Sequence, residues 1–356
     1  MQSQLSESRL EGIDFLRGIA IVEMLSAHYA VYFPPLLAKL IDYTETAMPL
    51  FVLLAGVIVG WGYRKFERDP KGQTWVVWRR ALRVLVIQYL MILTLGVPLY
   101  LLGMPGVGNG QSMGEFLVRS MFFLNQIGLL HILPTFVPLF AIAPAILFTL
   151  SRGWDGVLLL MSLVLFSVGH FHPHLLDLGQ PTIFPFILFQ LYFVIGCILG
   201  KVTSQQEALP PRRPRTWAVV SLGLLVTSML IAHGKVLPAH IISTHPLNFF
   251  GLLYELPLVA TVWLVSLLML SNLKRIWGYT CVARFGRHAL LSFVIHVYLA
   301  TALAVLNYLA PPPPWVNYML ILLSILVMNA IVKRYGVGRN MEPVPTWVRA
   351  AEGLFK

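Results

Sequence analysis

Long apolar segments separated by short polar connections follow one another along almost the whole chain. Most of these segments are close in length to a membrane-spanning α-helix, which needs about 20 residues to cross the hydrocarbon core of a bilayer. We therefore expect an all-α fold: a polytopic membrane protein of about ten transmembrane helices in a single domain, residues 1–356. The candidate spans are Asp14–Phe33, Thr46–Tyr63, Ala81–Leu102, His131–Leu150, Gly156–Val168, Thr182–Gly200, Thr216–Ala232, Asn248–Ser271, His288–Leu309 and Val316–Val332.

Composition agrees with this pattern, because 57% of the residues are hydrophobic and only 12% are charged. A soluble domain has roughly 25% charged residues. The formal net charge of +11 could indicate nucleic acid as a partner. The Lys and Arg residues, however, lie in separate short connections rather than on one continuous basic face, so we expect no nucleic-acid partner and a partnership with membrane lipid.

The basic residues occupy alternate connections, and this alternation predicts the orientation of the chain. Only Lys39, Arg119 and Lys235 lie in the connections of the other side. Because cytoplasmic loops are enriched in Lys and Arg, we expect both termini in the cytoplasm and the protein in a bacterial inner membrane. The connections expected in the cytoplasm contain Arg64, Lys65, Arg68, Lys71, Arg79, Arg80, Arg152, Lys201, Arg212, Arg213, Arg215, Lys274, Arg275, Arg284 and Arg287.

Two segments of the outer connections have a different character. Met113–Gln126 is too short and too interrupted to span a bilayer, so we expect an interfacial or re-entrant helix there. His170, His172 and His174 alternate with Phe and Pro in a pattern that could bind a metal. No Cys or paired carboxylate accompanies them, and we expect no metal site.

Ionisable side chains inside the first span are functional candidates, because a charge at the centre of a membrane helix costs on the order of 2.5–3.5 kcal/mol. At about 100° per residue, Arg17 and His28 share one face and lie about 16 Å apart along the helix axis. Asp14 is three residues before Arg17 and can pair with it. Glu23 points about 140° away from His28. An ion pair at the helix end and a histidine that bridges two helices remain alternative interpretations.

Two further clusters could bind an anion or line a cavity. Arg80 and Arg83 lie about one helical turn apart, so their guanidinium groups can form a fork for phosphate, or they can simply anchor the helix on the cytoplasmic side. The ninth span begins after Arg284-Phe-Gly-Arg287. Its His288 and His296 differ by about 80° around a helix and could line adjacent walls of one cavity or bridge neighbouring helices.

Several of these residues stand in motifs that resemble the integral-membrane acyltransferase superfamily, or acyltransferase family 3. Leu10-Glu-Gly-Ile-Asp-Phe-Leu-Arg-Gly18 followed by His28 matches its first-span pattern of an arginine, ten residues and a histidine. Arg80 and Arg83 match its Arg-x-x-Arg element. The chain looks most similar to the OpgC-type proteins, which succinylate osmoregulated periplasmic glucans. The segments of this closer resemblance are Leu130-His-Ile-Leu-Pro134, Phe186-Ile-Leu-Phe-Gln-Leu-Tyr-Phe-Val-Ile-Gly196 and Phe285-Gly-Arg-His-Ala-Leu290.

The chain also departs from the pattern of this branch at three positions. Ala55 precedes Gly56 where serine is usual, Ala27 precedes His28 where an acidic residue is usual, and His131 replaces an aspartate. The acyl group and the glycan are therefore left open.

The resemblance implies acyl-CoA as the cytoplasmic donor and a hydroxyl of an extracytoplasmic glycan as the acceptor, with no permanently bound cofactor. His28 would be the general base, in a catalytic group with Arg17 and Asp14. The basic side chains would bind the CoA phosphates. Donors to the thioester oxyanion would come from Ser292, His296 or Tyr29. The residues expected to bind acyl-CoA and line the cavity are Arg80, Arg83, Arg287, His288, Ser292 and His296.

A secondary transporter or exporter of a glycan or small polar substrate is the alternative, because such proteins also carry intramembrane charges and interrupted helices. We find no inverted repeat of the motifs, and the arginines cluster toward one side of the membrane rather than at its midplane. Hydrolysis or exchange of acyl-CoA by the purified protein distinguishes the two classes.

Overall fold

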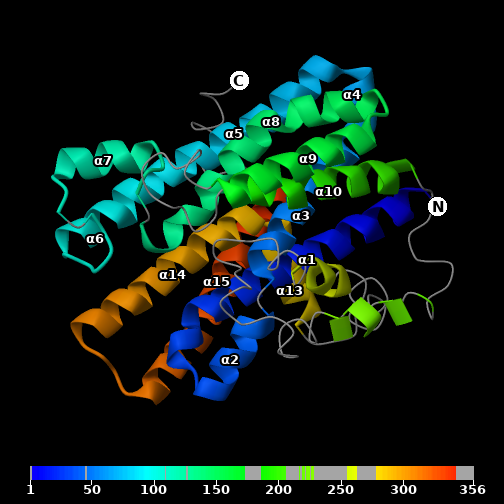
Figure 1. Ribbon diagram of the computed structural model, residues 1–356. Helices are drawn as coiled ribbons and strands as arrows, with labels where there is room; N and C mark the ends of the chain where they lie inside the picture. Colours follow the sequence, from blue (N-terminus) through cyan, green and yellow to red (C-terminus); the bar gives the residue numbers. More distant parts are fainter. Residues whose placement is uncertain are drawn as a thin grey trace. The chain divides into compact units, whose positions relative to one another are not determined.

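The computed structural model describes residues 2–44, 46–108, 110–125, 127–172, 186–205, 216, 219–220, 222–224, 226–227, 255–262 and 278–341 (Figure 1). All regular elements in these ranges are helices, as expected. The chain divides into two compact units, one of Met1–Asp42 with Leu270–Lys356 and one of Tyr43–Met269. The single domain of residues 1–356 remains a prediction.

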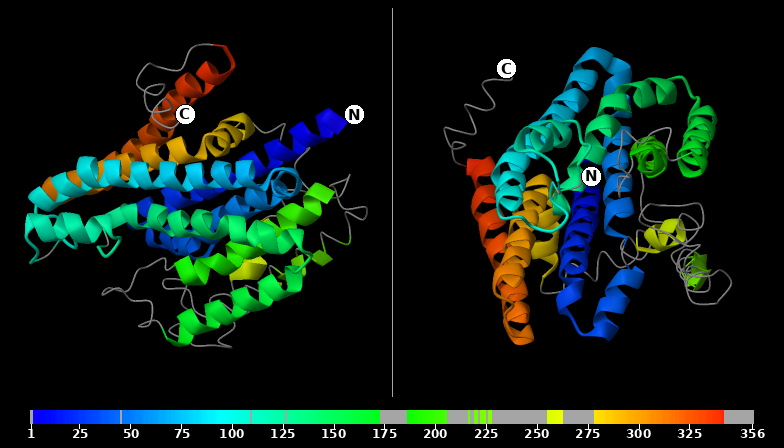
Figure 2. Two further views of the ribbon diagram at one scale, coloured as in Figure 1. Left: turned by 90° about the horizontal axis from the view of Figure 1, so that it is seen from above. Right: turned by 60° about the vertical axis from the view of Figure 1, so that its left-hand side comes forward.

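Unit 1 consists of the N-terminal and the C-terminal segments of the chain. Its elements are α1 (Gln2–Tyr29), η1 (Ala30–Tyr32), most of α2 (Pro35–Thr44), α13 (Tyr279–Arg287), α14 (Ala289–Leu309) and α15 (Pro314–Met341). The helices α14 and α15 run side by side (Figures 1 and 2). Near the turn between them, the amides of Asn307 and Asn317 donate to each other at 3.0 and 3.1 Å.

The contact between α1 and α13 depends on two glycines. A methyl group on Gly18 would collide with the carbonyl oxygen of Val282, and one on Gly286 would collide with the carbonyl oxygen of Asp14. The ring of Phe15 stacks on that of Tyr279 at a centroid distance of 4.7 Å. Backbone therefore meets backbone at this crossing, which places α13 directly against the polar half of α1.

Unit 2 contains the middle of the chain. Its elements are α3 (Ala47–Trp61), α4 (Tyr63–Arg68), α5 (Pro70–Met91), the π-helical turn η2 (Ile92–Gly96), α6 (Val97–Leu101), α7 (Met113–Met121), η3 (Gly128–His131), α8 (Ile132–Ser151), α9 (Asp155–Phe171) and α10 (Phe186–Gln205).

The helices α3 and α10 cross through paired glycines. Gly56 and Gly60 stand one turn apart on α3, and Gly196 and Gly200 stand one turn apart on α10. A methyl group on Gly56 would collide with the carbonyl oxygen of Phe193. Small residues at such a spacing allow membrane helices to approach closely, because apolar lipid gives no hydrophobic drive for their association. Gly56 thus has a packing reason that is independent of the missing serine beside it.

Within the described residues, six helices are long and apolar enough to cross a membrane. They are Ala47–Arg68, Pro70–Leu101, Ile132–Ser151, Phe186–Ser204, Ala289–Leu309 and Pro314–Tyr335. The shorter apolar helix Asp155–Phe171 overlies the fifth predicted span. The helix α1 covers the first and includes the charged Asp14, Arg17 and Glu23. Of the seventh predicted span only residues 216, 219–220, 222–224 and 226–227 are described, and of the eighth only residues 255–262. The total of ten and the orientation therefore remain predictions.

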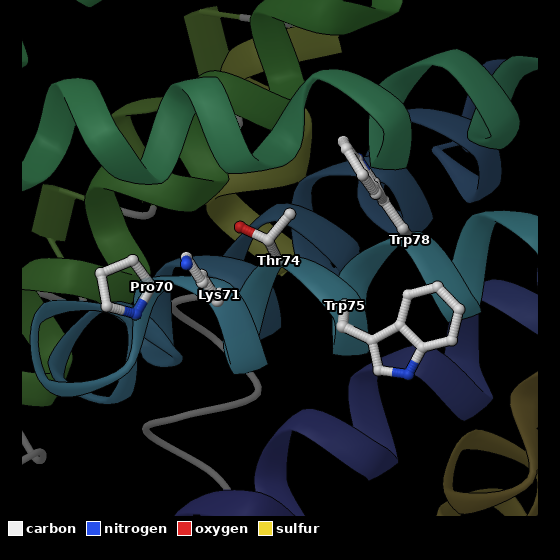
Figure 3. Close-up of a pocket in the computed structure, with 5 residues that line it drawn as sticks. All are labelled: Pro70, Lys71, Thr74, Trp75 and Trp78. Carbon is white, nitrogen blue, oxygen red and sulfur yellow. The ribbon is translucent and has the colours of Figure 1, made fainter. Parts of the chain in front are cut away.

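The start of α5 combines a capped first turn with exposed aromatic side chains. The carboxylate of Asp69 accepts a hydrogen bond from the Gly72 N–H at 2.9 Å, and Pro70 occupies the first turn. Trp75 and Trp78 are about half exposed and, with Pro70, Lys71 and Thr74, line a shallow depression (Figure 3). Tryptophan is enriched where membrane meets water. This end of α5 therefore has the side chains of an interfacial segment.

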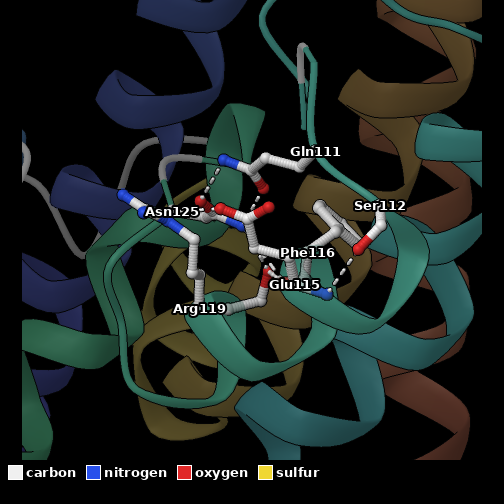
Figure 4. Close-up of polar contacts among 7 residues, drawn as sticks. Gln111, Ser112, Glu115, Phe116, Arg119 and Asn125 are labelled. Atoms are coloured by element: carbon white, nitrogen blue, oxygen red, sulfur yellow. Dashed lines mark hydrogen bonds and ion pairs between the residues drawn. The ribbon is translucent and has the colours of Figure 1, made fainter.

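The predicted helix in Met113–Gln126 is present as α7, and polar contacts hold the chain around it (Figure 4). The Ser112 hydroxyl caps its first turn by accepting from the Glu115 N–H at 3.3 Å. The side-chain amides of Gln111 and Asn125 donate to each other at 3.1 Å. These contacts tie both flanks of a nine-residue helix that is too short to span a bilayer.

One basic residue of the predicted cytoplasmic connections is buried. The Nζ of Lys201 lies 2.8 Å from both carboxylate oxygens of Asp155 and donates to the Leu150 carbonyl at 2.9 Å. Only 7% of Lys201 is exposed. Removing its partner would leave a buried charge uncompensated, so this pair fastens the end of α10 to the start of α9.

The predicted orientation leads to a labelling experiment with single cysteines at Lys71 and His172, which are both exposed. In a Cys281→Ser background, where the remaining Cys197 is buried, a cysteine at His172 should react with an impermeant thiol reagent applied outside. A cysteine at Lys71 should react only after the membrane is permeabilised. Labelling of the Lys71 position in intact cells would contradict the orientation.

Candidate functional site

The site candidates of unit 1 lie along α1. This helix is continuous from Gln2 to Tyr29, so the expected spacing of about 16 Å between Arg17 and His28 applies. Asp14 contacts α13 and His28 contacts α14, the next helix along the chain. Asp14 thus pairs with Arg287 of α13, and His28 pairs with His296 of α14. These contacts form two chemically different groups.

The first group is charged. Asp14 Oδ1 lies 3.7 Å from Arg17 Nη1, and Asp14 Oδ2 lies 3.6 Å from Arg287 Nε. The carboxylate therefore stands between two guanidinium groups, one of which is 62% exposed. The pairing of Asp14 with Arg17 is present as expected, and the contact with Arg287 adds α13 to it. This arrangement concentrates positive charge around a single carboxylate and can attract a polyanion.

The second group is a pair of imidazoles. The rings of His28 and His296 are parallel within 4°, with centroids 5.5 Å apart. His28 is half-buried near the end of α1, whereas His296 is fully buried in α14 and has the ring of Phe293 edge-on at 4.9 Å. A neutral imidazole offers both a proton donor and a proton acceptor. This pair can therefore perform acid–base chemistry.

The hydroxyl groups near this pair are hydrogen-bonded within the protein. Tyr29 donates to the Ser324 hydroxyl at 3.1 Å, and Ser292 donates to the Phe285 carbonyl at 3.1 Å. Both were expected as oxyanion donors. Their protons point to protein acceptors, so their first role is to fix α15 on α1 and to close the turn between α13 and α14.

His288 does not extend the helix that contains His296. It has φ −110° and ψ 42° and lies between α13 and α14, which begins at Ala289. The expected angle of about 80° between the two histidines assumed continuous helical backbone. That assumption is wrong, because the chain turns at His288.

Two further side chains of α13 and its surroundings refine the site. Arg284 Nη1 donates to Asn329 Oδ1 of α15 at 2.8 Å. Burial raises the pKa of the Cys281 thiol. A thiol with a raised pKa is a poor nucleophile near neutral pH, so Cys281 is not suited to covalent catalysis.

Arg80 and Arg83 belong to unit 2. Both are exposed on α5, and their three-residue separation within a continuous helix keeps them on one face, as predicted. They lie within the span Pro70–Leu101, which begins earlier than the predicted Ala81. The spacing suits a phosphate fork or an anchor on the cytoplasmic side.

A buried carboxyl group of unit 2 was missed by the sequence-based prediction. Glu255 is 2% exposed, and its Oε2 accepts a hydrogen bond from the fully buried Tyr192 hydroxyl at 3.0 Å. Two residues earlier on α10, the Gln190 side chain and Ser162 exchange two hydrogen bonds of 2.7 Å. An ionisable residue in an apolar segment is a functional signal by itself, and Glu255 in the eighth predicted span carried that signal.

In the part of the chain that the structure describes, no group of three or more His, Cys, Asp or Glu side chains could hold a metal ion. His170 ends α9 and His172 follows it, while His174 lies outside the described residues.

Apolar helices of membrane-spanning length and ionisable residues packed within unit 1 define a membrane protein with the groups of an enzyme site. A family model described as OpgC protein matches residues 9–337. The chain therefore belongs to the OpgC family, and this membership implies a transferase-type enzyme that modifies glucans. Searches of curated proteins and of solved structures found no match.

Proposed function

We propose that this protein is an O-acyltransferase of the bacterial inner membrane. It moves an acyl group, with succinyl as the first candidate, from cytoplasmic acyl-CoA to a hydroxyl of an extracytoplasmic glycan. The observation that carries the proposal is the His28–His296 pair, which lies about 16 Å along α1 from the Asp14–Arg17–Arg287 group. Acid–base groups and anion-binding groups are thus separated along one helix, as a long donor with phosphates at one end requires.

The charged group accounts for binding of the donor. Arg17 and Arg287 would contact the CoA phosphates. When no donor is bound, Asp14 would hold the two guanidinium groups in place. Arg287 is the more exposed of the two and would meet the ligand first. In unit 2, Arg80 and Arg83 are a separate candidate pair for binding phosphate. In unit 1, His288 lies next to Arg287 in the chain.

The imidazole group accounts for the transfer step. His28 would take the proton from the glycan hydroxyl, and the oxygen would attack the thioester carbonyl carbon. The tetrahedral intermediate then collapses, so that the new C–O bond stays and the C–S bond breaks. The His28 imidazolium returns its proton to the CoA thiolate. The products are an acylated glycan and free CoA, and His28 ends neutral.

A comparison of glycan masses in cells tests this function. A deletion strain that carries the wild-type gene should release glycans heavier than those of the empty strain by whole acyl groups. A strain with His28→Ala should release glycans of unmodified mass at equal protein level. Identical glycan masses in all three strains would contradict the proposal.

The fork of Arg80 and Arg83 should contribute to donor binding more than to chemistry. Each alanine substitution removes charge-assisted contacts of about 1.5–3 kcal/mol, so KM for acyl-CoA should rise about tenfold or more. Arg79→Ala, a neighbouring exposed arginine, is the matched control and should leave KM near the parental value. The measurement is steady-state transfer at varied acyl-CoA. If a dephosphorylated donor is used equally well by wild type and variants, the two arginines act only as anchors.

A further inference from the structure

His296 is a buried imidazole that the transfer step above does not use. Its side chain is fully buried in the middle of α14. The backbone of Ser292 and Phe293 lies close enough to interact with the ring, but neither ring nitrogen has a hydrogen-bond partner of regular distance and angle in the described ranges. A buried polar group without a partner costs free energy that an apolar side chain would save. A ligand atom that reaches this ring would recover that free energy.

The neighbouring ring of His28 restricts the protonation state of His296. The parallel ring of His28 lies 5.5 Å away, and two positive imidazoles at that separation repel each other in buried surroundings. When His28 takes up the hydroxyl proton, His296 therefore stays neutral. A neutral imidazole has one N–H and one lone pair, so His296 retains one hydrogen bond to donate during the step in which charge develops.

The other expected donors near this position are already engaged. The Tyr29 hydroxyl donates to Ser324, and the Ser292 hydroxyl donates to the Phe285 carbonyl. Using either proton for a substrate oxygen would break a bond inside the protein. The N–H of His296 has no side-chain acceptor among the described residues, and the backbone of Ser292 and Phe293 lies close to the ring.

We infer that His296 is a second catalytic residue, which donates a hydrogen bond to the acyl carbonyl oxygen of the thioester as that oxygen becomes negative. The inference rests on the proposed acyl transfer. No bond to His296 forms or breaks, and its proton remains on the ring throughout. His28 alone moves a proton, from the glycan hydroxyl to the CoA thiolate. His296 stabilises the oxyanion, and this role explains why a neutral imidazole is buried beside the base.

The same substitution at the two histidines separates their roles, because glutamine keeps an N–H donor but cannot act as a base near neutral pH. With succinyl-CoA and a soluble glucan as substrates, His28→Gln should lower kcat by about 10²–10⁴. His296→Gln should keep kcat within about tenfold of wild type, while His296→Leu, which has no donor, should lower it by about 10²–10³. KM for succinyl-CoA should stay within about threefold in all variants.

Each outcome supports or overturns the role of His296. A folded His296→Gln that is as inactive as His28→Gln would overturn it, and so would a His296→Leu with parental kcat. If His296→Leu does not fold, the folded His296→Gln decides alone, and a loss of kcat beyond about 100-fold overturns the role. Equal losses of thermal stability in both His296 variants with unchanged kcat would show a packing role only. Failure of the proposed function differs from all of these, because the wild type itself would then transfer no acyl group.

Discussion

Replacing His28 with alanine should lower kcat for acyl transfer by about 10²–10⁴, the contribution of a positioned general base. Binding of acyl-CoA should change little, because the phosphate-binding residues proposed in unit 1 lie about 16 Å away along α1. Single-turnover transfer and equilibrium binding of acyl-CoA to the purified protein measure the two quantities separately. The expected result is a protein that binds its donor and does not use it.

Ser26→Ala is the matched control for this substitution. It removes a polar group from the same turn of α1, where the Ser26 hydroxyl donates only to the Val22 carbonyl at 2.9 Å. It should leave both kcat and donor binding near the parental values. If His28 merely bridged α1 and α14, His28→Ala would lower the melting temperature, and the fraction that remains folded would transfer at the parental rate. That result would remove His28 from the mechanism.

Replacing Gly286 with alanine should cause the second large effect, because the added methyl group has no room. It would collide with the Asp14 carbonyl oxygen and lie 2.6 Å from the Gly18 nitrogen. Relief requires α13 to move away from α1, at a cost of about 1–3 kcal/mol. The same movement would separate Arg287 from Asp14 and disturb the proposed contacts with the CoA phosphates, so KM for acyl-CoA should rise.

Thermal unfolding in detergent and steady-state transfer measure these two consequences. Gly156→Ala is the control, since Gly156 lies in the first turn of α9 and an added methyl group there would have nothing within 4 Å. It should be neutral or slightly stabilising, because alanine favours helix more than glycine does. Parental stability together with parental activity in Gly286→Ala would show that the α1–α13 contact tolerates displacement and does not position the charged group.

The features that the sequence predicted correctly depend on local spacing. The helix that contains Arg17 and His28, the pairing of Asp14 with Arg17, and the common face of Arg80 and Arg83 follow from residues a few turns apart on one helix. The short helix in Met113–Gln126 follows from its length and its polar flanks. Such relations require only the helical period, which an apolar pattern reveals.

The features that the sequence did not predict depend on contacts between distant segments. His28 and His296 are 268 residues apart, and only the packing of α1 on α13 and α14 makes them neighbours. The close approach of Gly286 to Asp14 arises from the same packing. The angle assumed between His288 and His296 was wrong because an apolar pattern does not reveal a turn placed at a single residue. Glu255 was visible as an ionisable residue in an apolar segment, but its partner Tyr192 was not.

The proposed function is that this membrane protein transfers an acyl group rather than carrying a substrate across. The most direct test is to reconstitute the purified protein into liposomes with acyl-labelled succinyl-CoA and a glucan oligosaccharide. Labelled glucan and free CoA are expected in equal amounts with the wild type, and neither is expected with His28→Ala. Glucan that crosses the membrane unlabelled, while succinyl-CoA remains intact, would contradict acyl transfer as the function of this protein.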